Sequence, residues 1–164
     1  MKRFFLFLLP IVAVTMVSCI NLVENPSSTP TLQIGGIIVR SNLAGVRDTL
    51  TNFKDSTISV GDTLRVEMHV SGVLNNLTSV EAKADTSKVK VSLAWNEKDK
   101  DFLTSDAKPE NGLLTFKPKT VVSIGTTLTY IPRKAGDYKI SITVTSDALP
   151  EHSPRTWSFE TTAK

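Results

Sequence analysis

Three segments of the chain alternate strictly between apolar and polar residues, and this alternation constrains the fold more than any other feature. They are residues 64–71 (LRVEMHVS), 88–95 (KVKVSLAW) and 138–145 (YKISITVT). A period of two places successive side chains on opposite faces of an extended strand, so that one face enters a core and the other meets water. The three segments therefore predict half-buried antiparallel β-strands.

Six further segments have the composition of strands and are separated by turn-forming residues. They are residues 32–39, 57–60, 77–84, 113–117, 124–131 and 155–161. Short strands at this spacing indicate an all-β fold in which two antiparallel sheets pack face to face. We expect about seven to nine strands in one domain of residues 32–164, with at most a helical turn within residues 97–108.

Two segments resemble the immunoglobulin-like modules of bacterial surface proteins, including those similar to polycystic-kidney-disease and cadherin domains. Residues 61–66 (GDTLRV) are similar to a turn that enters a strand, and residues 135–145 (AGDYKISITVT) are similar to the penultimate strand with its corner tyrosine. The resemblance implies an immunoglobulin-like β-sandwich in which the hydroxyl group of Tyr138 bonds back to the main chain. Ile140 stands where the second immunoglobulin cysteine would be, so the resemblance implies no inter-sheet disulfide.

The amino terminus has the pattern of an export signal. Lys2 and Arg3 precede an uncharged apolar run over residues 4–17, and this run is shorter than the about 20 residues that a membrane-spanning helix needs. Residues 16–19 (MVSC) resemble the lipobox of bacterial lipoproteins, in which a small residue precedes the cysteine that receives a diacylglyceryl group. The resemblance implies that residues 1–18 are a cleaved signal peptide and that Cys19 carries the lipid.

A short polar segment separates this cysteine from the first expected strand. Residues 19–31 contain two prolines among serines and threonines, a composition that predicts a tether. Lipobox, tether and one β-domain together look like the small lipoproteins of Bacteroidetes. Ile20 and Asn21 do not match the aspartate that retains some lipoproteins in the inner membrane, and Glu24 alone does not make the acidic cluster that marks surface export. We therefore expect an outer-membrane anchor, with the periplasmic face favoured over the cell surface.

The net charge argues against nucleic acid as a partner. The whole chain carries a formal charge of +3. Removing residues 1–18 takes away Lys2 and Arg3 and leaves 17 basic and 16 acidic residues, a charge of +1. No run of lysine or arginine long enough to follow a phosphate backbone remains.

Few residues of the chain could carry chemistry. His69 and His152 have no second histidine or cysteine at metal-ligand spacing, and solvated histidine is the favoured interpretation for both. No serine lies in a Gly-x-Ser-x-Gly motif, and no glycine-rich phosphate loop is present. We expect no catalytic residue, no metal site and no cofactor. Paired carboxylates need only be neighbours in space, so a glycan hydrolase is the least favoured alternative.

The segment after the 88–95 strand contains the residues that we consider for binding. Asp99 and Asp101 belong to an acidic cluster that is interleaved with lysines and lacks the spacing of a calcium loop. A solvated loop is therefore favoured, and the sequence leaves calcium binding open. Trp95 ends the strand, where it either caps the core or offers a platform to a ligand. Together with His152 in a later loop, these residues define a possible binding surface.

Three serine or threonine residues follow aspartate in the manner of the O-glycosylation acceptors of Bacteroidetes. They are Thr49, Ser56 and Thr63. Turn chemistry before a strand is the alternative explanation, because aspartate commonly bonds to its own main chain there.

Two functions remain open from the sequence. The first is a lipid-anchored envelope module without catalytic activity that binds a protein partner or a glycan through loops, residues 96–111 or 147–154. The second is an accessory subunit of an envelope assembly, such as a secretion, conjugation or appendage system, that pairs through an exposed strand edge. The oligomeric state is not indicated.

Overall fold

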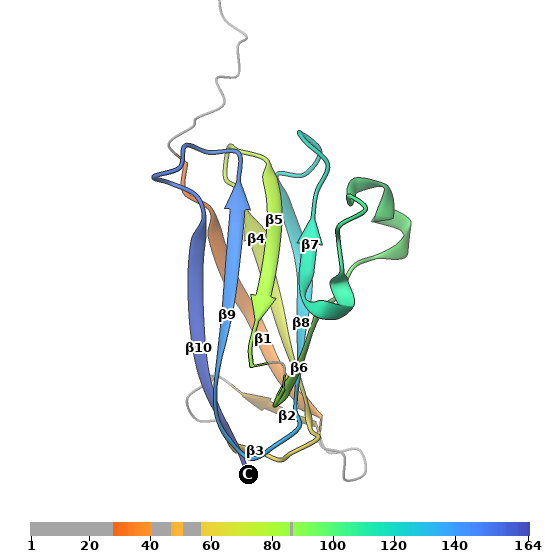
Figure 1. The fold of residues 1–164 in the computed structure, drawn as a ribbon, viewed down its shortest axis with the longest axis vertical. Helices are drawn as coiled ribbons and strands as arrows, with labels where there is room; N and C mark the ends of the chain where they lie inside the picture. Colours follow the sequence, from red (N-terminus) through yellow and green to blue (C-terminus); the bar gives the residue numbers. More distant parts are fainter. Residues whose placement is uncertain (1–27, 41–46, 51–56, 86) are drawn as a thin grey trace, which may run out of the picture.

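A computed structural model describes residues 28–40, 47–50, 57–85 and 87–164 (Figure 1). The expected signal peptide, Cys19, most of the tether and Ser56 lie outside the described residues, as does the side chain of Thr49. Within the described residues, no helix is long and apolar enough to cross a membrane.

In the described part of the chain, ten strands form two five-stranded sheets (Figure 1). The first sheet has the order β2 (Arg47–Leu50), β1 (Thr31–Arg40), β4 (Thr63–Ser71), β8 (Ser123–Pro132) and β6 (Val89–Leu93). The second has the order β3 (Thr57–Ile58), β10 (Arg155–Ala163), β9 (Gly136–Ser146), β5 (Leu77–Lys83) and β7 (Leu113–Thr115). All neighbours are antiparallel except β3 and β10, which pair in parallel.

All nine expected strands are present, and the described residues contain one further short strand, β2, that the sequence did not predict. β2 is only four residues long and its sequence, RDTL, shows no alternation. The segment that was expected to hold at most a helical turn contains the 3₁₀ helix η2 (Glu97–Phe102), and a second one, η3 (Pro109–Asn111), follows it. β1 begins at Thr31, the last residue of the expected tether.

The strand order is that of an immunoglobulin-like β-sandwich, as the sequence predicted. In immunoglobulin domains the first, second, fifth and fourth strands form one sheet in the order ABED, and the seventh, sixth and third form the other. Here β1, β4, β8 and β6 take the ABED positions, while β10, β9 and β5 take the GFC positions. β7 is an additional strand, which follows β6 in the chain but pairs with β5.

The core lies between the two sheets and is built by the alternating strands. In β4 every even-numbered side chain from Leu64 to Val70 is buried and the odd-numbered ones between them are exposed. Leu128 of β8 belongs to the same apolar cluster as Ile140 and Ile142 of the opposite sheet, and none of the three is exposed. The period of two in the sequence therefore separates core from surface.

Two tyrosines in this core differ in how their hydroxyl groups are satisfied. The hydroxyl group of Tyr138 donates to the backbone carbonyl of Lys134, which confirms the expected corner tyrosine. The ring of Tyr130 lies 6.2 Å from that of Tyr138, and its buried hydroxyl group has no hydrogen-bond partner in the described part of the chain. Burial, with a smaller contribution from Tyr138, raises the pKa of Tyr130 well above its ordinary value.

Replacing each tyrosine with phenylalanine is expected to change stability in opposite directions. Tyr138→Phe removes the bond to Lys134 and should lower the free energy of unfolding by about 1–2 kcal/mol. Tyr130→Phe removes an unsatisfied buried hydroxyl group and should leave stability unchanged or raise it by about 1 kcal/mol. Urea unfolding of both variants measures the difference. An equal loss of unfolding free energy in the two variants would show that the bond from Tyr138 to Lys134 does not stabilise the fold specifically.

The strand register places the tether and three loops at the same end of the sandwich. Thr31 pairs with Ser71, and Ser71 pairs with Ser123, so that the start of β1, the end of β4 and the start of β8 lie together. Leu77 pairs with Ser146, which adds the start of β5 and the end of β9. We call this the tether end (Figure 1). The carboxyl terminus lies at the opposite end.

Candidate binding groove

The candidate site lies where β6 leaves its sheet and β8 continues without it. The last bond between the two strands runs from the N–H of Ala94 to the carbonyl of Thr127, over 2.8 Å. The chain then turns into η2 because the side chain of Asn96 accepts a hydrogen bond from the N–H of Lys98, over 3.0 Å, and so caps the helix.

This departure leaves one edge of β8 open. In an antiparallel ladder the main-chain groups of successive residues point to opposite neighbours. Because Thr127 bonds toward β6, the N–H and carbonyl groups of Gly125 and Ser123 point to the same side, beyond the end of β6 at Leu93. No residue in the described ranges hydrogen-bonds to these groups on that side.

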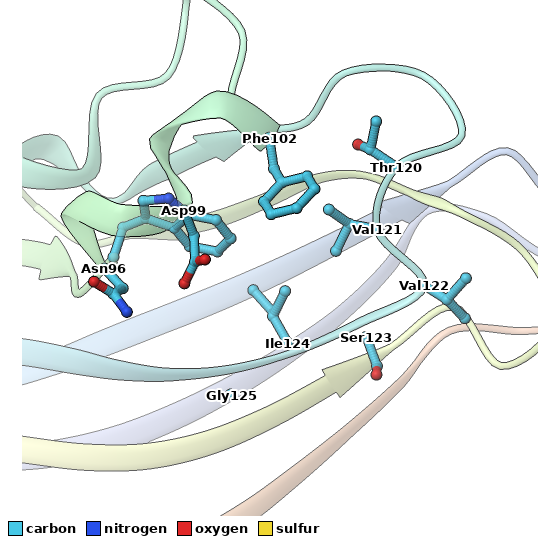
Figure 2. Close-up of a pocket in the computed structure, with 10 residues that line it drawn as sticks. Asn96, Asp99, Phe102, Thr120, Val121, Val122, Ser123, Ile124 and Gly125 are labelled. Atoms are coloured by element: carbon cyan, nitrogen blue, oxygen red, sulfur yellow. The ribbon is translucent and has the colours of Figure 1, made fainter.

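A groove with a volume of about 460 Å³ follows this open edge (Figure 2). One wall consists of the six consecutive residues 120–125, and the other consists of Trp95, Asn96, Asp99 and Phe102. Because the residues before β8 and the first three residues of β8 line the groove in sequence, the groove runs along this segment of the chain and not across it. Figure 2 shows Asp99 and Phe102 pointing from η2 toward the strand and Ile124 pointing from the strand toward η2.

The groove combines apolar side chains with one carboxylate. Phe102 is 43% exposed although it is a large apolar residue, and it lines the groove together with Val121 and Ile124. Asp99 is half-buried and is the only charged residue of the lining. It forms no ion pair with any residue that the structure describes.

Trp95 takes part in both the core and the groove. Its ring packs against Phe116, with 5.6 Å between the ring centroids and a tilt of 54°, and it contacts the edge of the apolar core. The same side chain lines the groove. Its indole N–H is buried and has no hydrogen-bond partner among the described residues, which is uncommon in native structures. Trp95 therefore caps the core, as one of the two alternatives predicted, and a role in ligand binding stays a prediction.

Gly125 lies at this site although the fold does not require glycine there. A Cβ atom at Gly125 would meet no atom within 4 Å, and its φ is not in the left-handed region. Glycine inside a strand is destabilising, and it often marks a place where a ligand or another main chain approaches closely. Beside the groove, Gly125 also lines a second hollow together with Glu67 and Thr127 on the outer face of the sheet.

The structure brings together only part of the binding surface that the sequence suggested. Trp95 and Asp99 line the groove, whereas Asp101 and His152 do not. His152 lies in the connection between β9 and β10, and a role for it or for Asp101 stays a prediction. Phe102, Val121 and Ile124 were missed because nothing in the sequence shows that residues 96–102 and 120–125 are neighbours.

The remaining candidates have simpler structural roles. Across the described ranges, no group of three histidine, cysteine, aspartate or glutamate residues is placed to hold a metal ion. Thr63 is the half-buried first residue of β4, and the preceding Asp62 accepts a hydrogen bond from the N–H of Ser59, over 2.9 Å. Asp62 therefore has the turn role that was the alternative explanation, and glycosylation of Thr63 stays a prediction.

Comparisons with known proteins find only distant similarity. No protein-family model matches the sequence, and no curated protein matches it. A DUF4466 family protein from Parabacteroides merdae aligns at 14% identity over 83% of this chain and 46% of its own, with a TM-score of 0.44. The seventh PapD-like domain of human CEP192 aligns at 16% identity over 88% of this chain and 89% of its own, with a TM-score of 0.37. A chain of a cohesin–dockerin complex aligns at 17% identity over 66% of this chain and 94% of its own, with a TM-score of 0.38. Similarities this weak carry no argument about function.

Proposed function

We propose that the chain is a lipid-anchored module of a bacterial cell envelope, of the Bacteroidetes type, that binds a protein partner along the open edge of β8. The partner contributes an extended segment that lies in the groove, in the position that β6 would occupy if it continued. The proposal assigns no catalytic role to the chain and makes it an accessory subunit of an envelope assembly, on the periplasmic face of the outer membrane.

The open edge of β8 is the observation that carries this proposal. A segment in the place of β6 can exchange main-chain hydrogen bonds with Gly125 and Ser123, which is the geometry of β-augmentation. A partner residue opposite Ile124 would project its side chain to the same face of the sheet as Ile124. There it would meet Phe102 and Val121, so an apolar residue is expected at that position. Asp99 at the groove wall favours a basic residue nearby.

A protein segment fits this site better than a glycan or a loop-bound ligand does. The open edge of β8 offers main-chain hydrogen bonds to an extended peptide. Stacking on a sugar would rest on Phe102 alone, because the ring of Trp95 packs on Phe116. The loops at residues 147–154, which were the alternative binding region, lie at the tether end and do not line the groove. Residues 96–102 contribute as one wall of the groove.

Replacing Gly125 with valine is expected to separate stability from binding. The new side chain meets no atom within 4 Å and has a higher strand propensity, so the free energy of unfolding should stay equal or rise by about 0.5–1 kcal/mol. The same side chain would project to the outer face, into the second hollow beside the open edge, and would crowd a segment that pairs there with β8. After in-cell crosslinking of the tagged full-length protein, recovery of the crosslinked partner should fall at least tenfold.

Thr129→Val provides the matched control for this experiment. Thr129 points to the same outer face of β8, but it pairs with Ser92 of β6 and does not line the groove. The control should keep wild-type crosslinking. Equal recovery of the same partner by the Gly125 variant and wild type would contradict binding at the β8 edge.

A further inference from the structure

Four large apolar side chains are exposed at the tether end. Val73 is 44%, Leu74 is 57%, Val122 is 43% and Leu149 is 43% exposed. They come from three different connections, β4–β5, β7–β8 and β9–β10, which all lie at this end (Figure 1). We call these four residues the apolar tip. Because these side chains are not buried in the core of the domain, core packing does not explain why they are apolar.

Hydrogen bonds hold the three connections of the tip to one another. The N–H of Gly72 donates to the carbonyl of Val122, over 2.8 Å. The N–H and the side-chain amide of Asn76 both donate to the carboxylate of Asp147, over 2.7 and 2.8 Å. The three connections that carry the tip are therefore held in a defined arrangement.

Val73 is an unfavourable residue for its own turn. Its φ is +65°, in the left-handed region, where a β-branched residue is an outlier. Asparagine or glycine would fit this backbone with less strain. A valine that is strained and also exposed is explained by neither local conformation nor folding, and such strain often marks a functional site.

The tether enters the domain beside this tip. The side-chain amide of Asn75, in the same turn as Val73 and Leu74, donates to the carbonyl of Ser28, over 3.1 Å. Cys19 precedes Ser28 by nine residues. Nine residues span at most about 30–32 Å even when fully extended, so a lipid at Cys19 would keep the tip within reach of the membrane surface.

We propose that the apolar tip rests on the lipid surface in which the chain is anchored, and this inference depends on the lipid anchor of the proposed function. Exposed aliphatic side chains insert at the boundary of headgroups and acyl chains. The tether raises the effective concentration of these side chains at that boundary. A contact of small area is therefore enough to keep the tip on the lipid surface. Val122 also lines the far end of the groove, so the bound domain would hold the groove beside the membrane with η2 facing the periplasm.

Spin labels on the full-length lipidated protein test this contact. Val73→Cys and Leu149→Cys place single labels on two connections of the tip. Val60→Cys is the matched control, because Val60 is an equally exposed valine, at 41%, whose N–H bonds to Lys164 at the opposite end. The accessibility of each label to a water-soluble nickel chelate is compared before and after the protein is placed in vesicles of phosphatidylethanolamine and phosphatidylglycerol. The accessibility of the tip labels should fall at least fivefold in the vesicles, whereas that of the Val60 label should not change.

The outcomes separate this inference from the proposed anchor. An intact mass without acyl chains overturns the lipid anchor, and the tip contact with it. An acylated protein in which the tip labels stay as accessible as the Val60 label overturns the tip contact alone.

Discussion

Replacing Leu128 with alanine is expected to lower the free energy of unfolding by about 3 kcal/mol, within the range of about 2–5 kcal/mol for buried leucines. Leu128 is fully buried, and it lies in β8 opposite Val66 of β4 and Leu93 of β6. The cavity would therefore open in the middle of the first sheet, against the second. Urea unfolding followed by tryptophan fluorescence measures the loss.

Thr129→Ala is the control for this effect. Thr129 is the next residue of β8 and points to the outer face, where it is half-buried. Its replacement should change the free energy of unfolding by at most about 0.5 kcal/mol. A loss as large as that of Leu128→Ala would show that the side chains of β8 are not divided between core and surface in the way described.

Replacing Cys19 with alanine is expected to remove the protein from the membrane fraction. The thiol is the only group in the chain to which a thioether-linked lipid can attach, because the sequence contains one cysteine. Several acyl chains give essentially permanent attachment, at about 0.8 kcal/mol for each buried CH₂ group, whereas the apolar tip alone gives weak contact. Fractionation of cells and the intact mass of the purified chain measure the change.

Retention in the membrane fraction, after a carbonate wash, of an alanine variant whose intact mass shows that residues 1–18 have been removed would contradict the lipid anchor. An acylated wild-type chain that keeps residues 1–18, seen as a higher intact mass after treatment of the cells with an inhibitor of the lipoprotein signal peptidase, is the independent check. Both measurements use the full chain and need no knowledge of the partner.

The fold followed from the sequence where local pattern decides the structure. Alternation in residues 64–71 and 138–145 identified β4 and β9, and the segment before Tyr138 identified the corner bond. β2 escaped detection because its four residues owe their strand conformation to pairing with β1. The composition of a short segment does not show which distant strand it will pair with.

The groove could be predicted only in part for the same reason. Trp95 and Asp99 stood out as an aromatic residue and a carboxylate at the end of a strand. The opposite wall comes from residues 120–125, and its open edge exists because β6 stops at Leu93 while β8 extends beyond it. Gly125, inside an otherwise regular strand, is a local signal of that opposite wall, but alternation in the neighbouring residues does not reveal what lies beside it.

The most direct test of binding at the β8 edge is a photo-crosslinking amino acid at Phe102, in the full-length protein expressed in its own host. The side chain of Phe102 points into the groove (Figure 2), so we expect one protein partner to be captured, with the link mapped to an extended segment that carries an apolar residue. The same amino acid at Val60, at the opposite end, should capture nothing specific. Capture of the same partner from both positions, or no partner from Phe102 in a fully acylated and folded protein, would contradict the proposed function.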